Sequence, residues 1–212
     1  MYRFENLDEH LEYIRNRKEY TEQEAKGSKE KGKIGELEFA KVMWSLFTKY
    51  PIVTSTGRED FIQHWDMAVH HPEKYYYFDV KNNYAELRGK GCYFFELMTV
   101  RGRPGWGAKS SYAEWVAYWY NTLTFVIVKT EKMREILYRN MGDPLKHKPK
   151  TKPLSEKKPY EAYRRYDRKD FIIGVPYEDF EPYSRFVGIE YFERKTKQRL
   201  EVDPELTKIF GE

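Results

Sequence analysis

The sequence has a single cysteine and no long apolar run, and both absences narrow the class of protein. Cys92 has no second cysteine to pair with, which excludes a disulfide-stapled scaffold and fits a reducing compartment. No stretch approaches the roughly 18 apolar residues of a membrane-spanning helix. The first residues also lack the apolar run of a signal peptide. We therefore expect a soluble, cytoplasmic protein.

The composition is that of a globular domain with a very polar surface. The chain has 212 residues, of which 40% are hydrophobic, 34% charged and 17% aromatic, enough for one well-packed core. The net charge of +4 is modest, but residues 146–169 hold ten Lys or Arg against three acids. Such a segment either attracts polyanions or is a solvated loop, and charge alone leaves both open.

Hydrophobic spacing divides the chain into an N-terminal helical extension, residues 1–31, and a single domain, residues 32–212. Leu7, Leu11 and Ile14 recur at helical spacing in the extension. Gly32 and Gly35 are expected to interrupt the helical pattern, and a stable helix should begin at Glu36. Its apolar stripe consists of Phe39, Val42, Met43, Leu46 and Phe47.

The rest of the domain alternates between extended and helical patterns. Strands are predicted at residues 52–55, 62–70, 75–81, 92–99, 124–128 and 171–176. Residues 112–118 fit a helix or a further strand, a helix is expected at 131–140, and the Pro- and Lys-rich residues 142–159 predict a loop. This order predicts an α/β fold with a central mixed sheet flanked by helices.

The segment Phe78-Asp79-Val80-Lys81 carries the most specific chemical signal. Side chains alternate across a strand, so Asp79 and Lys81 should share the face opposite to the core. On the preceding strand, Trp65 and Met67 are expected to pack while Asp66 projects away. If the two strands form a hairpin, Asp66 and Asp79 come close together, which is costly unless a cation lies between them.

A hard divalent cation at such a pair could polarise a phosphate and acidify a bound water. Lys81 could then orient that water or neutralise developing charge. The simpler alternative is that Asp66 and Asp79 are ordinary strand residues and Lys81 pairs with Asp79. Because Asp is disfavoured in strands, two such residues on adjacent strands favour a site.

A helix bearing Glu36, a strand with Asp66 and a next strand with Asp79-x-Lys81 resembles the PD-(D/E)XK nuclease superfamily. Within this superfamily, the pattern Gly32-x-x-x-Glu36 at the start of the helix resembles the Holliday-junction resolvase-like and phage nuclease branch. The resemblance covers roughly residues 32–130, and Trp65 stands where the family's nominal proline would be. It implies a restriction-endonuclease-like core of order α-β-β-β-α-β.

The resemblance also implies an activity, which is metal-dependent hydrolysis of DNA phosphodiester bonds, with branched structures as one class of substrate. Glu36, Asp66 and Asp79 would bind Mg²⁺ or Mn²⁺, and Lys81 would position the nucleophile. Glu38 makes the helix assignment ambiguous, but it lies about 200° from Glu36, so only one of the two can face the site. Resolvase-like relatives often dimerise, which makes a homodimer one alternative.

Weaker signals concern nucleic-acid contacts. Arg103, Trp106 and Lys109 lie in or next to a Gly-rich loop, where cations could grip phosphates and the aromatic ring could stack on a base. A tight loop with Trp106 as a core plug is equally compatible. Arg164 and Arg165 belong to an aromatic and cationic stretch that suits a backbone-tracking groove or a surface helix.

Other motifs point away from competing chemistries. His64, His70 and His71 flank Asp66, but no Cys or His spacing typical of zinc surrounds them.

Glu96 interrupts an apolar strand and is either a further site carboxylate or a partner of Lys81. Two rival functions remain: a catalytically inactive nucleic-acid-binding module of the same fold, and an interaction protein that docks an acidic partner.

Overall fold

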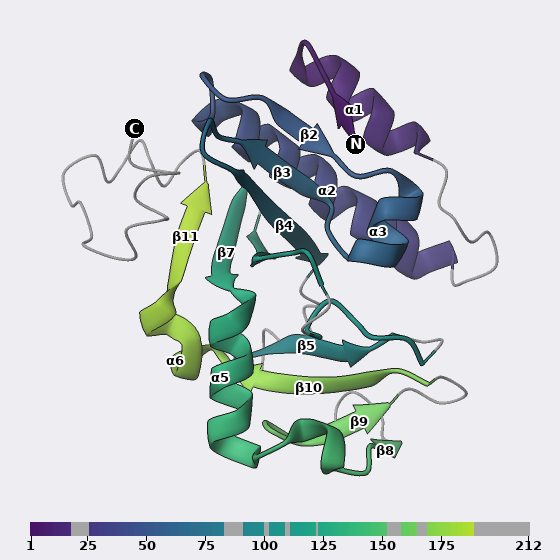
Figure 1. The fold of residues 1–212 in the computed structure, drawn as a ribbon, viewed down its shortest axis with the longest axis vertical. Coiled ribbons are helices and arrows are strands. Elements are labelled where there is room, and N and C mark those ends of the chain that lie inside the picture. Colours follow the sequence, from purple (N-terminus) through teal and green to yellow (C-terminus); the bar gives the residue numbers. More distant parts are fainter. Residues whose placement is uncertain are drawn as a thin grey trace.

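The computed structural model describes residues 1–17, 26–82, 91–99, 102–108, 111–121, 123–151, 158–164 and 169–188. These residues form a mixed α/β structure with a seven-stranded sheet and a four-stranded sheet (Figure 1). No helix among them is long and apolar enough to cross a membrane.

The large sheet has the strand order β1-β2-β3-β4-β6-β7-β11. Its strands are β1 (Tyr2–Arg3), β2 (Ile52–Thr54), β3 (Met67–His70), β4 (Tyr75–Asn82), β6 (Trp115–Asn121), β7 (Thr124–Lys129) and β11 (Ser184–Gly188). All neighbouring pairs are antiparallel except β4 and β6, which run parallel with Asp79 opposite Val116. The sheet is therefore mixed, as the sequence predicts, and residues 112–118 lead into a strand.

The long helix α2 (Lys26–Leu46) starts earlier than expected, because neither Gly32 nor Gly35 interrupts it. A Cβ at Gly35 would lie 3.8 Å from both Val80 Cγ1 and Asn82 Cβ, so the glycine lets the helix approach β4 closely. Each glycine costs about 1 kcal/mol of helix propensity. Packing of the apolar stripe on the sheet overrides that cost.

The N-terminal residues pack against α2 and the edge of the large sheet. Strand β1 pairs with β2, and α1 (Leu7–Asn16) packs on α2 through Leu11 and Ile14. The side chain of Asn6 accepts a hydrogen bond from the backbone N–H of Glu9, which satisfies one of the free donors at the start of α1. The helix ends at Asn16, and the next residue, Arg17, caps it by donating its backbone N–H to the carbonyl of Tyr13.

Residues 92–98 form a strand as predicted but belong to another sheet. This strand, β5 (Cys92–Met98), pairs with β10 (Phe171–Pro176), and the smaller sheet continues through β9 (Ala162–Arg164) to β8 (Lys150–Thr151). The predicted strand is thus present, but the sequence pattern did not reveal the sheet to which it belongs. Apolar alternation predicts a strand, but it does not identify the neighbour with which that strand pairs.

The large sheet is covered on both faces. One face packs against α1 and α2, and the other packs its β6–β7 half against β5, β10 and α5 (Thr130–Met141). The β3–β4 half of that second face carries only a small cluster of Val53, Trp65, Ala68 and Ala113. The remaining helical elements are α3 (Gly57–Gln63), α6 (Tyr177–Phe180) and short 3-10 turns at Pro144–Lys146 and Glu181–Tyr183.

Candidate active site

Asp79 and Lys81 project from the same face of β4, as the alternation predicts. Phe78 and Val80 point the other way, into the core against α2. The Lys81 ammonium lies 2.9 Å from Asp79 Oδ1 and 2.7 Å from Oδ2. Only 1% of Asp79 is exposed, whereas 33% of the Lys81 side chain is exposed. Lys81 is therefore the solvent-facing member of a pair whose carboxylate is buried.

Asp66 lies directly before β3 and lines up with the same part of β4. Its backbone N–H donates to the carbonyl of Phe78 at 2.8 Å, and its Oδ2 accepts from the backbone N–H of Val80 at 2.7 Å. The Asp66 carboxylate thus accepts the hydrogen bond of a β4 N–H just beyond the last backbone pair of β3 and β4, Met67 with Phe78. This bond holds Asp66 beside the residue that separates Asp79 from Lys81.

The segment before Asp66 differs from the expected strand at residues 62–70, because the strand starts at Met67 and residues 57–63 form α3. Thr56 and Glu59 form a capping box that begins this helix, a signal that the sequence carries as Thr-x-x-Glu. Trp65 was expected to share a face with Met67. It packs instead on Tyr77 at 5.0 Å, on the opposite face, because strand alternation does not extend back to it.

Glu36 reaches this region from α2 with a partner that sequence reasoning missed. Arg17 Nη2 lies 3.1 Å from Glu36 Oε1 and 2.9 Å from Oε2, and the Arg17 side chain is only 3% exposed. The guanidinium also donates to Ser55 Oγ at 3.4 Å and lies 3.9 Å from Asp60. No sequence signal singled out Arg17, because residues 1–33 hold eight Lys or Arg with nothing to rank them.

The charged groups influence one another strongly. Burial raises the pKa of Glu36 to about 8, with Arg17 opposing this and Asp66 adding to it. Burial also raises the pKa of Asp79 well above its ordinary value against the effect of Lys81. For Lys81, burial is outweighed by Asp79, Asp66 and Glu96, so its pKa is raised and it stays an ammonium at neutral pH. The four predicted residues therefore form one electrostatic unit.

The donor chemistry of this unit fits a hard cation that takes few protein ligands. Three buried carboxyl groups face two cations, Arg17 and Lys81. Because burial raises the pKa of both Glu36 and Asp79, a surplus negative charge exists only when both are ionised, a state that a bound cation would favour. Among the residues that the structure describes, no three His, Cys, Asp or Glu side chains are arranged to hold a metal ion. Mg²⁺ needs only one or two carboxylates beside phosphate oxygens and water, which Asp66 and Asp79 could provide.

Two further acids are placed by the structure. Glu38 pairs with Lys41 at 2.6 Å, so Glu36 is the α2 carboxylate that joins the charge cluster. Glu96 on β5 contributes to the raised pKa of Lys81. It therefore lies within electrostatic reach of the site although its strand belongs to the smaller sheet.

Trp106 is a buried plug and not a base-stacking surface, which corrects one of the two readings of the Gly-rich loop. Its ring is 3% exposed and packs edge-on against Phe95 at 4.9 Å. The Lys81 ammonium lies 5.6 Å from the ring centroid, so Trp106 forms an aromatic floor under the cation.

The other residues expected to contact nucleic acid are dispersed. Arg103 is exposed, with its guanidinium 4.8 Å from the ring centroid of Phe61 on α3. Arg164 is exposed on β9, in the smaller sheet. Lys109 and Arg165 lie outside the described residues. Of the predicted set, the structure therefore brings together Glu36, Asp66, Asp79 and Lys81.

Comparison with known proteins adds no relative: no family model, no curated protein and no solved structure matches this chain.

Proposed function

We propose that this chain is a metal-dependent nuclease of the PD-(D/E)XK type that hydrolyses phosphodiester bonds of DNA. One observation carries the proposal. The carboxylate of Asp66 accepts a hydrogen bond from the backbone N–H of Val80, the residue between Asp79 and Lys81 on β4, so Asp66 lies beside the Asp79–Lys81 pair. A side-chain carboxylate, that of Asp66, accepts the Val80 N–H where a backbone carbonyl would accept it in a regular strand ladder. A second buried carboxylate, that of Asp79, lies next to it. This arrangement supports a functional role over a structural one.

Each residue then has a role that follows from its surroundings. Asp66 and Asp79 would hold Mg²⁺ or Mn²⁺, which when bound would polarise the phosphate and lower the pKa of a bound water. Lys81 stays protonated because its pKa is raised, so it acts as a cation that orients the water or neutralises charge on the phosphate. Arg17 holds Glu36 in place, since it contacts both carboxylate oxygens.

A second candidate is a nucleic-acid-binding module of the same fold without catalysis. The observation that favours it is the internal pairing of the site. Lys81 contacts both oxygens of Asp79, and Arg17 contacts both oxygens of Glu36. Such pairs also serve a purely structural purpose when charges are buried. This candidate predicts retardation of DNA without cleavage.

The deciding experiment is incubation with plasmid, linear, single-stranded and branched DNA, in Mg²⁺, Mn²⁺ or EDTA. We expect the parent protein to cut with a divalent metal and not in EDTA. Asp79→Asn should reduce the rate about 100-fold or more, because it removes charge from a metal ligand. Glu38→Gln is the matched control, since Glu38 pairs with Lys41 outside the charge cluster. Cleavage by Asp79→Asn at the parent rate would refute the assignment.

A further inference from the structure

The outer edge of the smaller sheet is strongly basic, and the proposed function does not use it. Strand β8 lies at this edge and pairs with β9. Figure 1 shows both strands on the far side of β10 from the large sheet. Residues 143–151 and 158–164, which include a 3-10 turn, β8 and β9, hold five Lys or Arg against two acids. Five cations against two carboxylates leave an excess of three positive charges, whichever pairs form.

The two acids of this region are engaged locally. Asp143 caps the 3-10 turn by accepting the backbone N–H of Leu145 at 3.1 Å. Glu161 pairs with the Lys150 ammonium at 2.8 Å, but the Glu161 side chain is only 16% exposed, against 63% for Lys150. Because an exposed ion pair is weak, Lys150 can still contact an anion from solvent.

We name the cations Lys146, Lys148, Lys150 and Arg164 the basic edge. Lys148 and Lys150 occupy alternate positions of the segment that leads into β8, about 7 Å apart if it is fully extended. Arg164 lies opposite Thr151 on the neighbouring strand and leaves the sheet on the other face from Lys150. All four residues of the basic edge are exposed. Lys146, Lys148 and Arg164 make no ion pair with any other residue that the structure describes.

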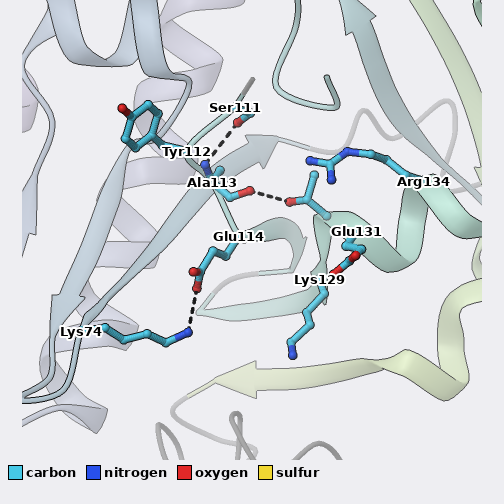
Figure 2. A pocket seen from close by; sticks show the side chains of 9 residues that line it. Lys74, Ser111, Tyr112, Ala113, Glu114, Lys129, Glu131 and Arg134 are labelled. Atoms are coloured by element: carbon cyan, nitrogen blue, oxygen red, sulfur yellow. Dashed lines mark hydrogen bonds and ion pairs between the residues drawn. The ribbon is translucent and has the colours of Figure 1, made fainter. Parts of the chain in front are cut away.

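The basic edge differs in charge arrangement from the pocket at the start of α5 (Figure 2). That pocket has a volume of about 350 Å³ and places Lys74, Lys129 and Arg134 among Glu114 and Glu131. Lys74 pairs with Glu114 at 3.4 Å. Opposite charges therefore alternate around the pocket, whereas positive charge is concentrated at the basic edge.

Two simpler explanations account for less of the pattern at the basic edge. Lysine on an edge strand prevents edge-to-edge pairing, but Lys146 lies in the turn before β8 and Arg164 on the inner strand β9. Docking of another protein fits poorly, because lysine is depleted at protein–protein interfaces. Protein–DNA interfaces are much more positively charged. The chemistry of this surface therefore fits a phosphate backbone.

We propose that the basic edge binds the phosphate backbone of duplex DNA without sequence preference. Long side chains from both faces of the sheet can turn towards one backbone that lies along the edge. A duplex carries one negative charge per about 1.7 Å, so a surface that acts by charge alone gains most from a duplex. Contacts to phosphates carry no direct sequence information.

The inference rests on the proposed function and deepens it, because it names the part of the substrate that is held and the surface that holds it. The order β5-β10-β9-β8 puts β8 three strand spacings, about 15 Å, from β5. Trp106, which lies beside Lys81, packs on Phe95 of β5. The basic edge is thus separate from the candidate active site, and the two can be tested separately.

The test is binding in EDTA, so that no cleavage intervenes. Fluorescence anisotropy measures the affinity of the parent protein for labelled blunt DNA duplexes of two unrelated sequences, over a series of salt concentrations. We expect equal affinity for the two duplexes. The triple variant Lys146→Gln, Lys148→Gln, Arg164→Gln should bind about ten-fold more weakly. Its slope of log affinity against log salt should be smaller by about 2–3, since each lost phosphate contact removes about 0.9.

A second triple variant, Arg3→Gln, Arg15→Gln, Lys49→Gln, is the matched control. It removes the same net charge from exposed residues of β1, α1 and the bend before β2, at the other end of the molecule (Figure 1). We expect it to bind the duplexes as the parent does. Lys146→Gln alone should reduce the slope by about 0.9, and this variant leaves β8 intact should the first triple variant aggregate.

Equal weakening by the two triple variants would overturn the inference, because binding would then follow net charge alone. Failure of the parent to bind the duplexes would overturn it too. So would displacement of the duplex by poly-glutamate as effectively as by unlabelled duplex, which would indicate an acidic protein partner. Cleavage is scored separately with Mn²⁺. Duplex binding that depends on the basic edge without any cleavage would support the edge and refute the nuclease, while cleavage with unaffected binding by the first triple variant would do the reverse.

Discussion

Acid should weaken the fold through His10, a histidine with no exposed surface that joins α1 to α2 and β2. The indole N–H of Trp44 donates to His10 Nδ1 at 2.8 Å, and His10 Nε2 bonds to the hydroxyl of Thr54. An indole nitrogen only donates, so Nδ1 must be the bare nitrogen and Nε2 the protonated one. A second proton would have to enter at Nδ1, where it would face the indole N–H.

The magnitude follows from the pKa. Burial, helped by the charge of Arg17, lowers the pKa of His10 from 6.5 to about 4. Between these values the unfolded chain binds a proton that the folded protein does not, so stability falls as the pH drops from 6.5 towards 4. At about 1.4 kcal/mol per pKa unit, the difference between the unfolded and folded pKa values of His10 corresponds to about 3 kcal/mol of unfolding free energy.

Urea unfolding at a series of pH values, followed by tryptophan fluorescence, measures this free energy. His10→Gln is the comparison, because glutamine does not titrate and the carboxylates contribute equally to both curves. We expect the loss between pH 6.5 and 4 to be about 3 kcal/mol larger in the parent. Trp44→Phe should raise the pKa of His10 in an NMR titration. Parallel stability curves for parent and His10→Gln would refute the reasoning.

Two further predictions concern stability at neutral pH. Arg17→Met should lower the unfolding free energy by about 1–3 kcal/mol, because it removes the hydrogen-bond donor of the buried Glu36 carboxyl, whose pKa is about 8. Adding Glu36→Gln should recover part of the loss, and a melting temperature of Arg17→Met equal to the parent's would contradict this. Gly107→Ala should destabilise by about 1–3 kcal/mol, because its Cβ would lie 2.5 Å from the Phe95 ring and 2.8 Å from the Glu96 carbonyl. Gly32→Ala, with open space around it, should stabilise by up to about 1 kcal/mol, and equal changes at the two glycines would count against the packing argument.

Local patterns in the sequence were sufficient to predict the centre of the candidate site. Alternation along residues 75–81 predicts that Asp79 and Lys81 share a face away from Phe78, and the structure has them so. The choice of Glu36 over Glu38 also agrees with the observed partners. These features depend only on the repeat of one strand and one helix, which the sequence records directly.

Features that depend on distant parts of the chain were not predictable in the same way. Residues 92–98 read as a strand, but their pairing with β10 is decided by residues 171–176. Arg17 lies nineteen positions before Glu36, and nothing in its neighbourhood distinguishes it from the other cations. The Thr-x-x-Glu start predicts the helix at residues 57–63. The apolar alternation suggests a strand from residue 62, but the strand starts only at Met67.

The pairing of β5 with β10 has a consequence for the order in which a ribosome completes the protein. The charged residues Arg17, Glu36, Asp66, Asp79 and Lys81 have all been synthesised once the ribosome reaches residue 81. Trp106, whose ring lies against the Lys81 ammonium, packs in one core cluster with Phe95 and with Ile173 and Val175 of β10. Until β10 emerges, β5 has no strand beside it and its apolar side chains face water. Chains truncated before residue 171 should therefore aggregate through this unmatched edge even though every charged residue of the site is present.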